Sequence, residues 1–199
     1  MGLISTLVQA LVGNYFGIFA LMFLEGTSLP IPSEVVMPLG GALSRDGSLT
    51  IWLVIVVGTM GSLLGSLVDY YVALYAGEAV VKRYGTYFHI TENRLNSVQK
   101  WFSNYGTLAV FSMRFVPGFR ALISFPAGFG RMKIVKFIGA TFLGHLIWDT
   151  ILAYLGYTYS SSWNTLISVV DQYLNYIAAV LAVVIIAYLI FLFIKTRTR

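Results

Sequence analysis

Four charged residues interrupt two apolar stretches of the sequence. Glu25 and Glu34 lie in the first stretch, LEGTSLPIPSEVVMPLGGALSR, and Arg114 and Arg120 lie in the second, YGTLAVFSMRFVPGFRALISFPAGFGR. A charge at the centre of a membrane helix costs roughly 2.5–3.5 kcal/mol on insertion scales, so charges in such segments indicate a functional site. Two guanidinium groups beside a helix break can hold phosphate oxygens through paired hydrogen bonds. The sequence therefore predicts an anion site with phosphate as its natural guest.

The glutamates have two expected roles at this site. They can pair with the arginines while the site is empty, or bind and release protons during a transport cycle. The alternative is that the four groups form fixed ion pairs that only hold the protein together. Asp69, His145 and Asp149 are weighed as further proton-coupling residues, since His145 and Asp149 share one helical face. For His145 the alternative is a buried side chain satisfied by a neighbour.

Composition assigns these residues to a membrane protein. Of 199 residues 58% are hydrophobic and 11% are charged, whereas soluble domains carry about 25% charged residues. Residues 47–68 and 173–194 are uncharged and exceed the roughly 20 residues that cross a bilayer. The residues before Glu25 show neither a basic start nor a cleavage site, so we expect them in the mature protein.

The absence of cysteine excludes disulfides and thiolate chemistry. We expect no metal and no cofactor. The net charge of +5 comes mainly from loops and ends, where it indicates membrane orientation, and we expect no nucleic-acid partner.

Basic residues predict the orientation of the chain. They gather in three segments that we expect on the cytoplasmic side: 82–100, 131–136 and 195–199. Residues 159–172 contain no Lys or Arg and are expected on the opposite side. Residues 47–77 then run inward, 134–158 run outward and 173–194 return, which places the C-terminus in the cytoplasm of a multi-pass protein of the cell membrane. Residues 3–24 form either a full span or one arm of a hairpin.

Residues 25–45 and 105–131 are predicted to form re-entrant hairpins. The residues expected to break their helices are Pro30, Pro32, Pro117, Gly118, Pro126 and Gly128. Irregular backbone at membrane depth is tolerated only where protein covers it or where it lines a water-filled cavity, so both hairpins should lie inside the bundle. Two kinked ordinary helices are the alternative.

The two halves of the chain resemble each other. Matching positions are Glu25 with Arg114, Pro38 with Pro126, Gly40 with Gly128, Gly65 with Gly144, and Asp69 with Asp149. Because the long spans of the two halves run in opposite directions, the halves form an inverted repeat, as in many secondary transporters. We expect an all-α integral membrane protein with one domain over residues 1–199. Its parts are a first repeat (about 13–77), a linker (78–104), a second repeat (about 104–158) and a C-terminal helix (173–194).

Two smaller features concern packing. Thr91 can cap a short helix in the linker, lying either at the membrane interface or in a solvated loop. Gly61 and Gly65 form a GxxxG pattern that favours close helix contact, which we expect within one bundle. Contact between protomers of a homo-oligomer is the alternative.

The run FLEGTSLPIPSE and the later run RFVPGFRALISFPAGFGRMK, followed by Phe137, Gly144, Trp148 and Gly156-Tyr157, resemble the DedA family. This family is also called the SNARE-associated or VTT-domain family, and the resemblance covers residues 13–158. It implies two re-entrant hairpins that face each other and a role in lipid transport. By motif, the family's essential acids correspond to Glu25 and Glu34, and its essential arginines to Arg114 and Arg120.

One position departs from the family pattern. Members often carry Gly-Asp just before an aromatic pair in the second span, whereas here Gly65-Ser66 stands there and Asp69 directly precedes Tyr70-Tyr71. The role of that family acid is therefore not carried over to Asp69.

The resemblance to the DedA family implies a lipid flippase. Members of that family act on polyprenyl phosphates or on phospholipids. The expected substrate is undecaprenyl phosphate or a related polyprenyl phosphate, with coupling to protons as an option. Phosphatidylethanolamine transport or scrambling and a non-transporting scaffold are the alternatives. We expect no enzymatic activity, because His89 and His145 lie apart from the arginine motif and the sequence contains no SGH-type phosphatase motif, HExxH or GxSxG.

Overall fold

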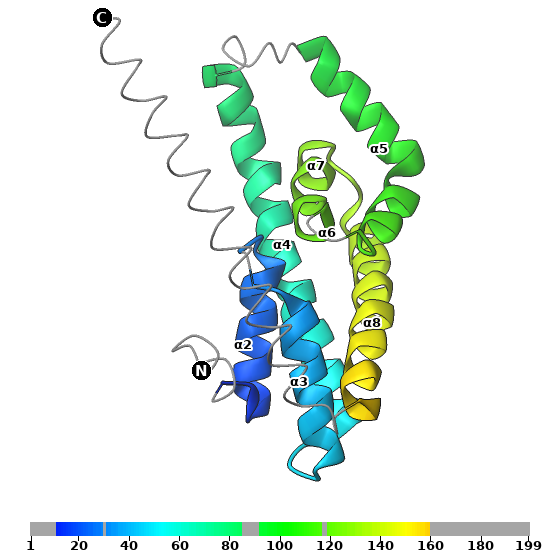
Figure 1. The fold of residues 1–199 in the computed structure, drawn as a ribbon. Coiled ribbons are helices and arrows are strands. Elements are labelled where there is room, and N and C mark those ends of the chain that lie inside the picture. Colours follow the sequence, from blue (N-terminus) through cyan, green and yellow to red (C-terminus); the bar gives the residue numbers. More distant parts are fainter. Residues whose placement is uncertain (1–10, 30, 85–91, 117–118, 160–199) are drawn as a thin grey trace, which may run out of the picture.

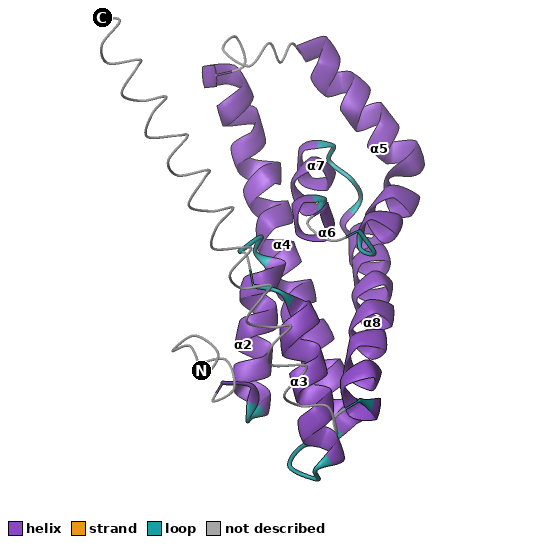
Figure 2. Ribbon diagram, viewed as in Figure 1, coloured by secondary structure: helices purple, strands orange, loops and turns teal. Residues whose placement is uncertain are grey.

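The computed structural model describes residues 11–29, 31–84, 92–116 and 119–159. Their helices are α2 (Tyr15–Gly26), α3 (Ser33–Arg45), α4 (Ile51–Tyr84), α5 (Glu92–Met113), α6 (Phe119–Leu122), α7 (Ser124–Phe129) and α8 (Ile134–Thr158). No strand occurs in this part of the chain, so the all-α prediction is confirmed there (Figure 2). The predicted helix 173–194 and the predicted break residues Pro30, Pro117 and Gly118 lie outside the described residues.

In the described part of the chain, two helices are long and apolar enough to cross a membrane, over Ile51–Tyr75 of α4 and Ile134–Thr158 of α8. Exposed apolar side chains recur about once per turn along them: Trp52, Val56, Met60, Leu64 and Val68 on α4, and Leu143, Ile147, Ile151 and Leu155 on α8. The buried residues, by contrast, include several acids and arginines. An apolar outer surface around a charged interior is typical of a protein dissolved in lipid.

The first hairpin consists of α2, a turn and α3. The Asn14 side chain caps α2 by accepting a hydrogen bond of 2.8 Å from the backbone N–H of Gly17. Pro32, which has no N–H to offer, is the N-cap residue of α3. The Tyr15 hydroxyl accepts a 2.8 Å hydrogen bond from the backbone N–H of Thr50, just beyond α3. The start of α2 and the end of α3 therefore lie together, and the two helices are antiparallel.

The second hairpin consists of α5, a break, and the short helices α6 and α7. A Cβ on Gly130, just after α7, would meet the ring of Phe102 in α5, so the chain returns alongside the helix by which it entered. The short linker helix expected near Thr91 is not separate from this hairpin. The structure joins it to the first limb as one helix, Glu92–Met113.

The expected breaks at Pro126 and Gly128 need correction, since both residues lie inside α7, Ser124–Phe129. Pro126 is in the first turn of that helix, where backbone N–H groups have no acceptor within the helix. A proline there sacrifices no hydrogen bond, so the helix continues through it.

Each hairpin packs its two limbs on different long helices. α2 lies against α4, where a Cβ on Gly61 or Gly65 would meet the backbone of α2. This confirms the prediction that the GxxxG pattern mediates contact within the bundle. α5 lies against α8, where a Cβ on Gly144 would meet the side chain of Arg114. The first limb of each hairpin thus packs on the long helix of its own half.

The returning limbs cross to the other half. α3 packs on α8, where a Cβ on Gly156 would meet the carbonyl group of Pro38. α7 packs on α4, where a Cβ on Gly128 would meet the carbonyl oxygen of Tyr70. In Figure 1, α2 and α3 lie beside the lower half of α4, and α6 and α7 lie beside its upper half.

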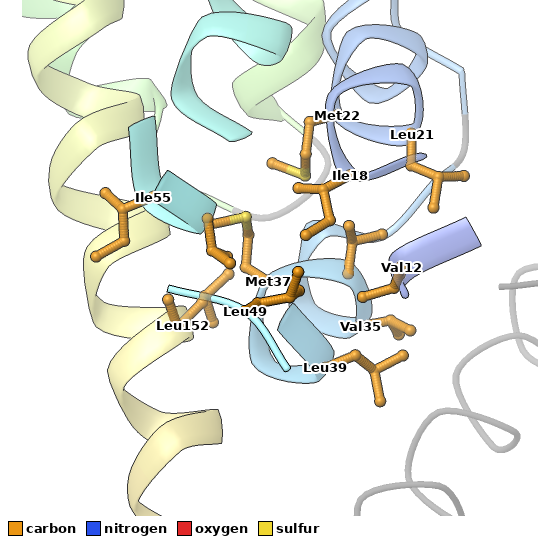
Figure 3. Packing of buried hydrophobic residues seen from close by; sticks show 13 residues of the cluster. Val12, Ile18, Leu21, Met22, Val35, Met37, Leu39, Leu49, Ile55 and Leu152 are labelled. Carbon is orange, nitrogen blue, oxygen red and sulfur yellow. The ribbon is translucent and has the colours of Figure 1, made fainter. Parts of the chain in front are cut away.

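Two apolar clusters enclose a polar layer. The first cluster joins α2, α3, α4 and α8 around residues such as Ile18, Met37, Ile55 and Leu152 (Figure 3). The second joins α4, α5, α7 and α8 around Tyr70, Phe102, Val110, Ala127 and Phe137. Between the two clusters, α4 buries Thr59, Ser62, Ser66 and Asp69, and α8 buries Thr141, His145 and Asp149. The polar layer lies where the hairpin turns meet.

Candidate functional site

Arg120 of α6 joins both limbs of the first hairpin. Its Nε lies 3.1 Å from Oε1 of Glu25, at the end of α2, and its Nη2 lies 3.1 Å from Oε2 of Glu34, at the start of α3. The side chains of Arg120 and Glu25 are 6% and 3% exposed, whereas that of Glu34 is 28% exposed. The second half of the chain therefore supplies the cation, and the first half supplies both anions.

Neighbouring side chains hold this pair of bridges in place. Ser62 of α4 donates a hydrogen bond of 3.2 Å to the second oxygen of Glu25, Oε2. The guanidinium carbon of Arg120 lies 5.8 Å from the centre of the Trp148 ring in α8, which is within cation–π distance. Arg120 is thus positioned by three elements other than its own short helix.

Arg114, directly after α5, is buried and bonded only to neutral groups among the described residues. One terminal nitrogen, Nη1, donates to the backbone carbonyl of Arg120. The other, Nη2, donates to the hydroxyls of Ser124 at 3.0 Å and Thr141 at 3.2 Å. No carboxylate in the described part of the chain lies within 4.0 Å of Arg114. Within the described residues, this buried cation therefore lacks a direct counter-ion.

Each arginine also keeps a buried donor that is not used within the described residues. These donors are Nε of Arg114 and Nη1 of Arg120. A buried polar group without a hydrogen bond costs about 1–3 kcal/mol, and more when it is charged. Guanidinium donors of this kind are suited to bind the oxygens of an anion.

The three residues considered for a proton relay lie in the same polar layer but have separate partners. Asp69 accepts from Ser28 at 2.5 Å, and Asp149 accepts from Thr59 at 3.2 Å. His145 Nε2 lies 3.3 Å from the Ser66 hydroxyl. Among the described residues, no direct hydrogen bond links Asp69, His145 and Asp149 to one another.

Sequence analysis missed the hydroxyl residues of the site. They are Ser28, Thr59, Ser62, Ser66, Ser124 and Thr141. Thr59, Ser62 and Ser66 recur at helical spacing within an apolar span, a polar face that periodicity could have revealed. Ser28, Ser124 and Thr141 carry no comparable signal.

Comparison with known proteins matches residues 31–158 to the VTT domain. This protein belongs to the VTT-domain, or DedA, family. The matched region contains Glu34, Arg114 and Arg120, and Glu25 lies just before it. No solved structure gives a significant match to this VTT-domain protein.

Named relatives of this VTT-domain protein cover most of its length. Undecaprenyl phosphate transporter A of Bacillus subtilis is 34% identical over 168 residues, which are 84% of this chain and 83% of the relative. The protein of the same name from Staphylococcus aureus is 32% identical over 180 residues, which are 87% of this chain and 89% of the relative. A Lactococcus lactis protein named alkaline phosphatase-like protein is 36% identical over 189 residues, which are 92% of this chain and 88% of the relative.

Proposed function

We propose that this VTT-domain protein moves a phosphate-bearing lipid between the leaflets of the cell membrane, with undecaprenyl phosphate as the substrate. The observation that carries the proposal is the pair of buried guanidinium groups, Arg114 and Arg120. Each has a donor that no described residue uses, where the two hairpins meet. The names of two relatives, undecaprenyl phosphate transporter A, support the same substrate.

The physical task of such a transporter is to shield the headgroup. A polyprenyl tail can stay in hydrocarbon throughout the crossing, so only the anionic phosphate must be kept out of an apolar medium. Nε of Arg114 and Nη1 of Arg120 would donate to the phosphate in place of water, in a geometry that planar guanidinium groups favour. A small bundle is sufficient for this purpose.

The ion pairs of Arg120 give the unloaded state of the proposed cycle. While the site is empty, Glu25 and Glu34 occupy two of the three nitrogens of Arg120. A phosphate that binds Arg120 competes with these carboxylates, and their return after release resets the site. Binding and release of protons by the glutamates would bias the direction of transport in this scheme.

The proposal includes a membrane arrangement. Both hairpins enter the bilayer and return to the side of entry, from opposite faces, as the two halves of an inverted repeat. The crossed packing of α3 on α8 and of α7 on α4 supports this arrangement. If a two-fold axis relates the two halves, each contact of one hairpin with the other half's long helix has an equivalent contact made by the second hairpin. The basic segments of the sequence support a cytoplasmic C-terminus in this arrangement.

A zwitterionic phospholipid such as phosphatidylethanolamine is the second candidate substrate. Its phosphate would bind the arginines, and its ammonium group would bind a glutamate. Glu34 favours this alternative, because its side chain is 28% exposed and bonded to Arg120 through one oxygen. Either substrate uses the same four charged residues.

Transport in vesicles that contain only this protein tests the proposal. Labelled undecaprenyl phosphate and labelled phosphatidylethanolamine would be followed separately, with and without a pH gradient, together with release of free phosphate. We expect protein-dependent movement of undecaprenyl phosphate without phosphate release. Movement of the phospholipid alone would reassign the substrate, phosphate release would indicate an enzyme, and no movement of either lipid would remove the transporter proposal.

A further inference from the structure

The turn of the first hairpin contains a strained residue. Ser28 has a φ angle of 57°, in the left-handed region that residues other than glycine rarely adopt. Its backbone N–H donates to the carbonyl oxygen of Glu25 at 3.1 Å. The conformation of Ser28 is therefore coupled directly to the residue that binds Arg120.

A buried carboxylate on α4 holds this strained residue. The Ser28 hydroxyl donates to Oδ2 of Asp69 at 2.5 Å, and Asp69 is 5% exposed. The contact extends the packing of α2 on α4, where Gly65, one helical turn before Asp69, lies against the backbone of Gly26. Asp69 thus binds the turn just beyond the point where α2 ends.

We infer that Asp69 is a positioning residue, which through Ser28 keeps the turn against α4 and so keeps Glu25 on Arg120. The inference rests on the proposed function, because it assigns Asp69 a part in setting how strongly Glu25 competes with a phosphate. The conformation of Ser28 is unfavourable for a serine by itself, so the hydrogen bond to Asp69 helps to retain it, together with the backbone hydrogen bonds of the turn. Asp69 contacts neither the substrate donors nor Arg120 by a hydrogen bond among the described residues.

Four substitutions separate the hydrogen bond from the charge and from the strain. Ser28→Ala removes the hydroxyl and keeps the strain, so the turn should leave α4 most readily. Ser28→Gly also removes the hydroxyl but accepts the left-handed conformation, so its effect should be smaller. Asp69→Ala should resemble Ser28→Ala, whereas Asp69→Asn keeps an acceptor oxygen and should stay close to the wild type.

Thr27→Val is the matched control. Thr27 lies in the same turn, but among the described residues its hydroxyl donates only to the carbonyl of Leu24 within the turn. Loss of that hydroxyl leaves the contact with α4 intact. The valine variant should therefore match the wild type in every measurement below.

The first measurement does not depend on lipid transport. The chain has no cysteine, so Leu29→Cys places one thiol in the turn, at a position that is 47% exposed. Labelling by a membrane-impermeant maleimide in vesicles should be about fivefold faster with Ser28→Ala or Asp69→Ala, the change expected for loss of one hydrogen bond. Ser28→Gly should fall between these variants and the wild type.

The second measurement is transport of undecaprenyl phosphate as a function of its mole fraction. A freed turn weakens the hold of Glu25 on Arg120, so Ser28→Ala should lower the half-saturating lipid fraction and also lower the maximal rate. General damage to the fold would not lower the half-saturating lipid fraction.

Equal labelling and equal transport in Ser28→Ala and the wild type would overturn the positioning role, as would an Asp69→Asn variant that behaves like Asp69→Ala. If the wild type moves no lipid but the labelling rates keep the expected order, the proposed function fails and the positioning role stands.

Discussion

Arg114 donates a hydrogen bond to the backbone carbonyl of Arg120, so one arginine of the site braces the helix that carries the other. The two arginines are not equivalent. Arg120 is held by two carboxylates, whereas the described partners of Arg114 are a carbonyl and two hydroxyls. Substitution of Arg114 and substitution of Arg120 should therefore disturb the protein in different ways.

Arg114→Lys tests the bracing role. An ammonium group cannot reach the Arg120 carbonyl and the hydroxyls of Ser124 and Thr141 with the geometry of a planar fork. Buried acceptors left unpaired should lower the free energy of unfolding by about 1–3 kcal/mol. We also expect transport of undecaprenyl phosphate to fall by about tenfold or more. Thermal unfolding in detergent and transport in vesicles measure the two effects, and full transport by the lysine variant would contradict the role of Arg114.

The losses of stability and transport caused by Glu25→Gln and Glu34→Gln should follow how deeply each glutamate is buried. Glu25 is nearly inaccessible and also accepts from Ser62, so its neutralisation leaves a buried guanidinium with a weaker partner. Glu34 is partly exposed, and its bridge to Arg120 should contribute at most about 1 kcal/mol. We expect the larger loss of stability and of transport in Glu25→Gln. A more severe effect of Glu34→Gln would indicate that Glu34 has the dominant role in the cycle.

Gly156→Ala tests the crossed packing between the halves. A methyl group at this position would meet the carbonyl of Pro38 in α3, so α3 and α8 must separate at a cost of about 1–3 kcal/mol. Gly139→Ala is the control in the same helix, because a methyl group there meets nothing within 4 Å. Alanine at that position should stabilise the helix by about 0.5–1 kcal/mol. Equal melting temperatures for the two variants would argue against close contact between α3 and α8.

Asp46→Cys and Lys133→Cys test the proposed orientation. Both positions are exposed, Asp46 just after α3 and Lys133 just before α8. The positive-inside rule places residues 131–136 in the cytoplasm, and Asp46 follows the hairpin that enters from the opposite face. An impermeant thiol reagent added to intact cells should label Asp46→Cys and spare Lys133→Cys. Labelling of both from outside would remove the arrangement of opposed hairpins.

The sequence indicates which charged residues form the site and that the glutamates can pair with the arginines, but not that both glutamates pair with Arg120. Charges in apolar stretches are conspicuous, and the bounds of α8 match the predicted span 134–158. That Arg120 takes both glutamates depends on how two hairpins far apart in the chain meet, which periodicity does not encode. The role of Ser28 could likewise not be predicted from the sequence, because it depends on a backbone angle and on a partner in another helix.

The helix ends show a similar division. Pro32 stands where the chain re-enters a helix, whereas Pro126 continues one, because its position in the first turn requires no N–H donor. The residue type alone does not distinguish these two settings. The distinction depends on where the preceding break falls, which is a property of the folded hairpin.

An experimental structure with undecaprenyl phosphate bound tests the central claim most directly. The account predicts phosphate density between the hairpin turns, with its oxygens about 2.7–2.9 Å from Nε of Arg114 and Nη1 of Arg120. It also predicts that at least one of the two carboxylate bridges to Arg120 is lengthened relative to the 3.1 Å of the empty site. Phosphate bound elsewhere, with both bridges unchanged, would show that the four charges are a structural ion-pair network and would contradict the proposed site.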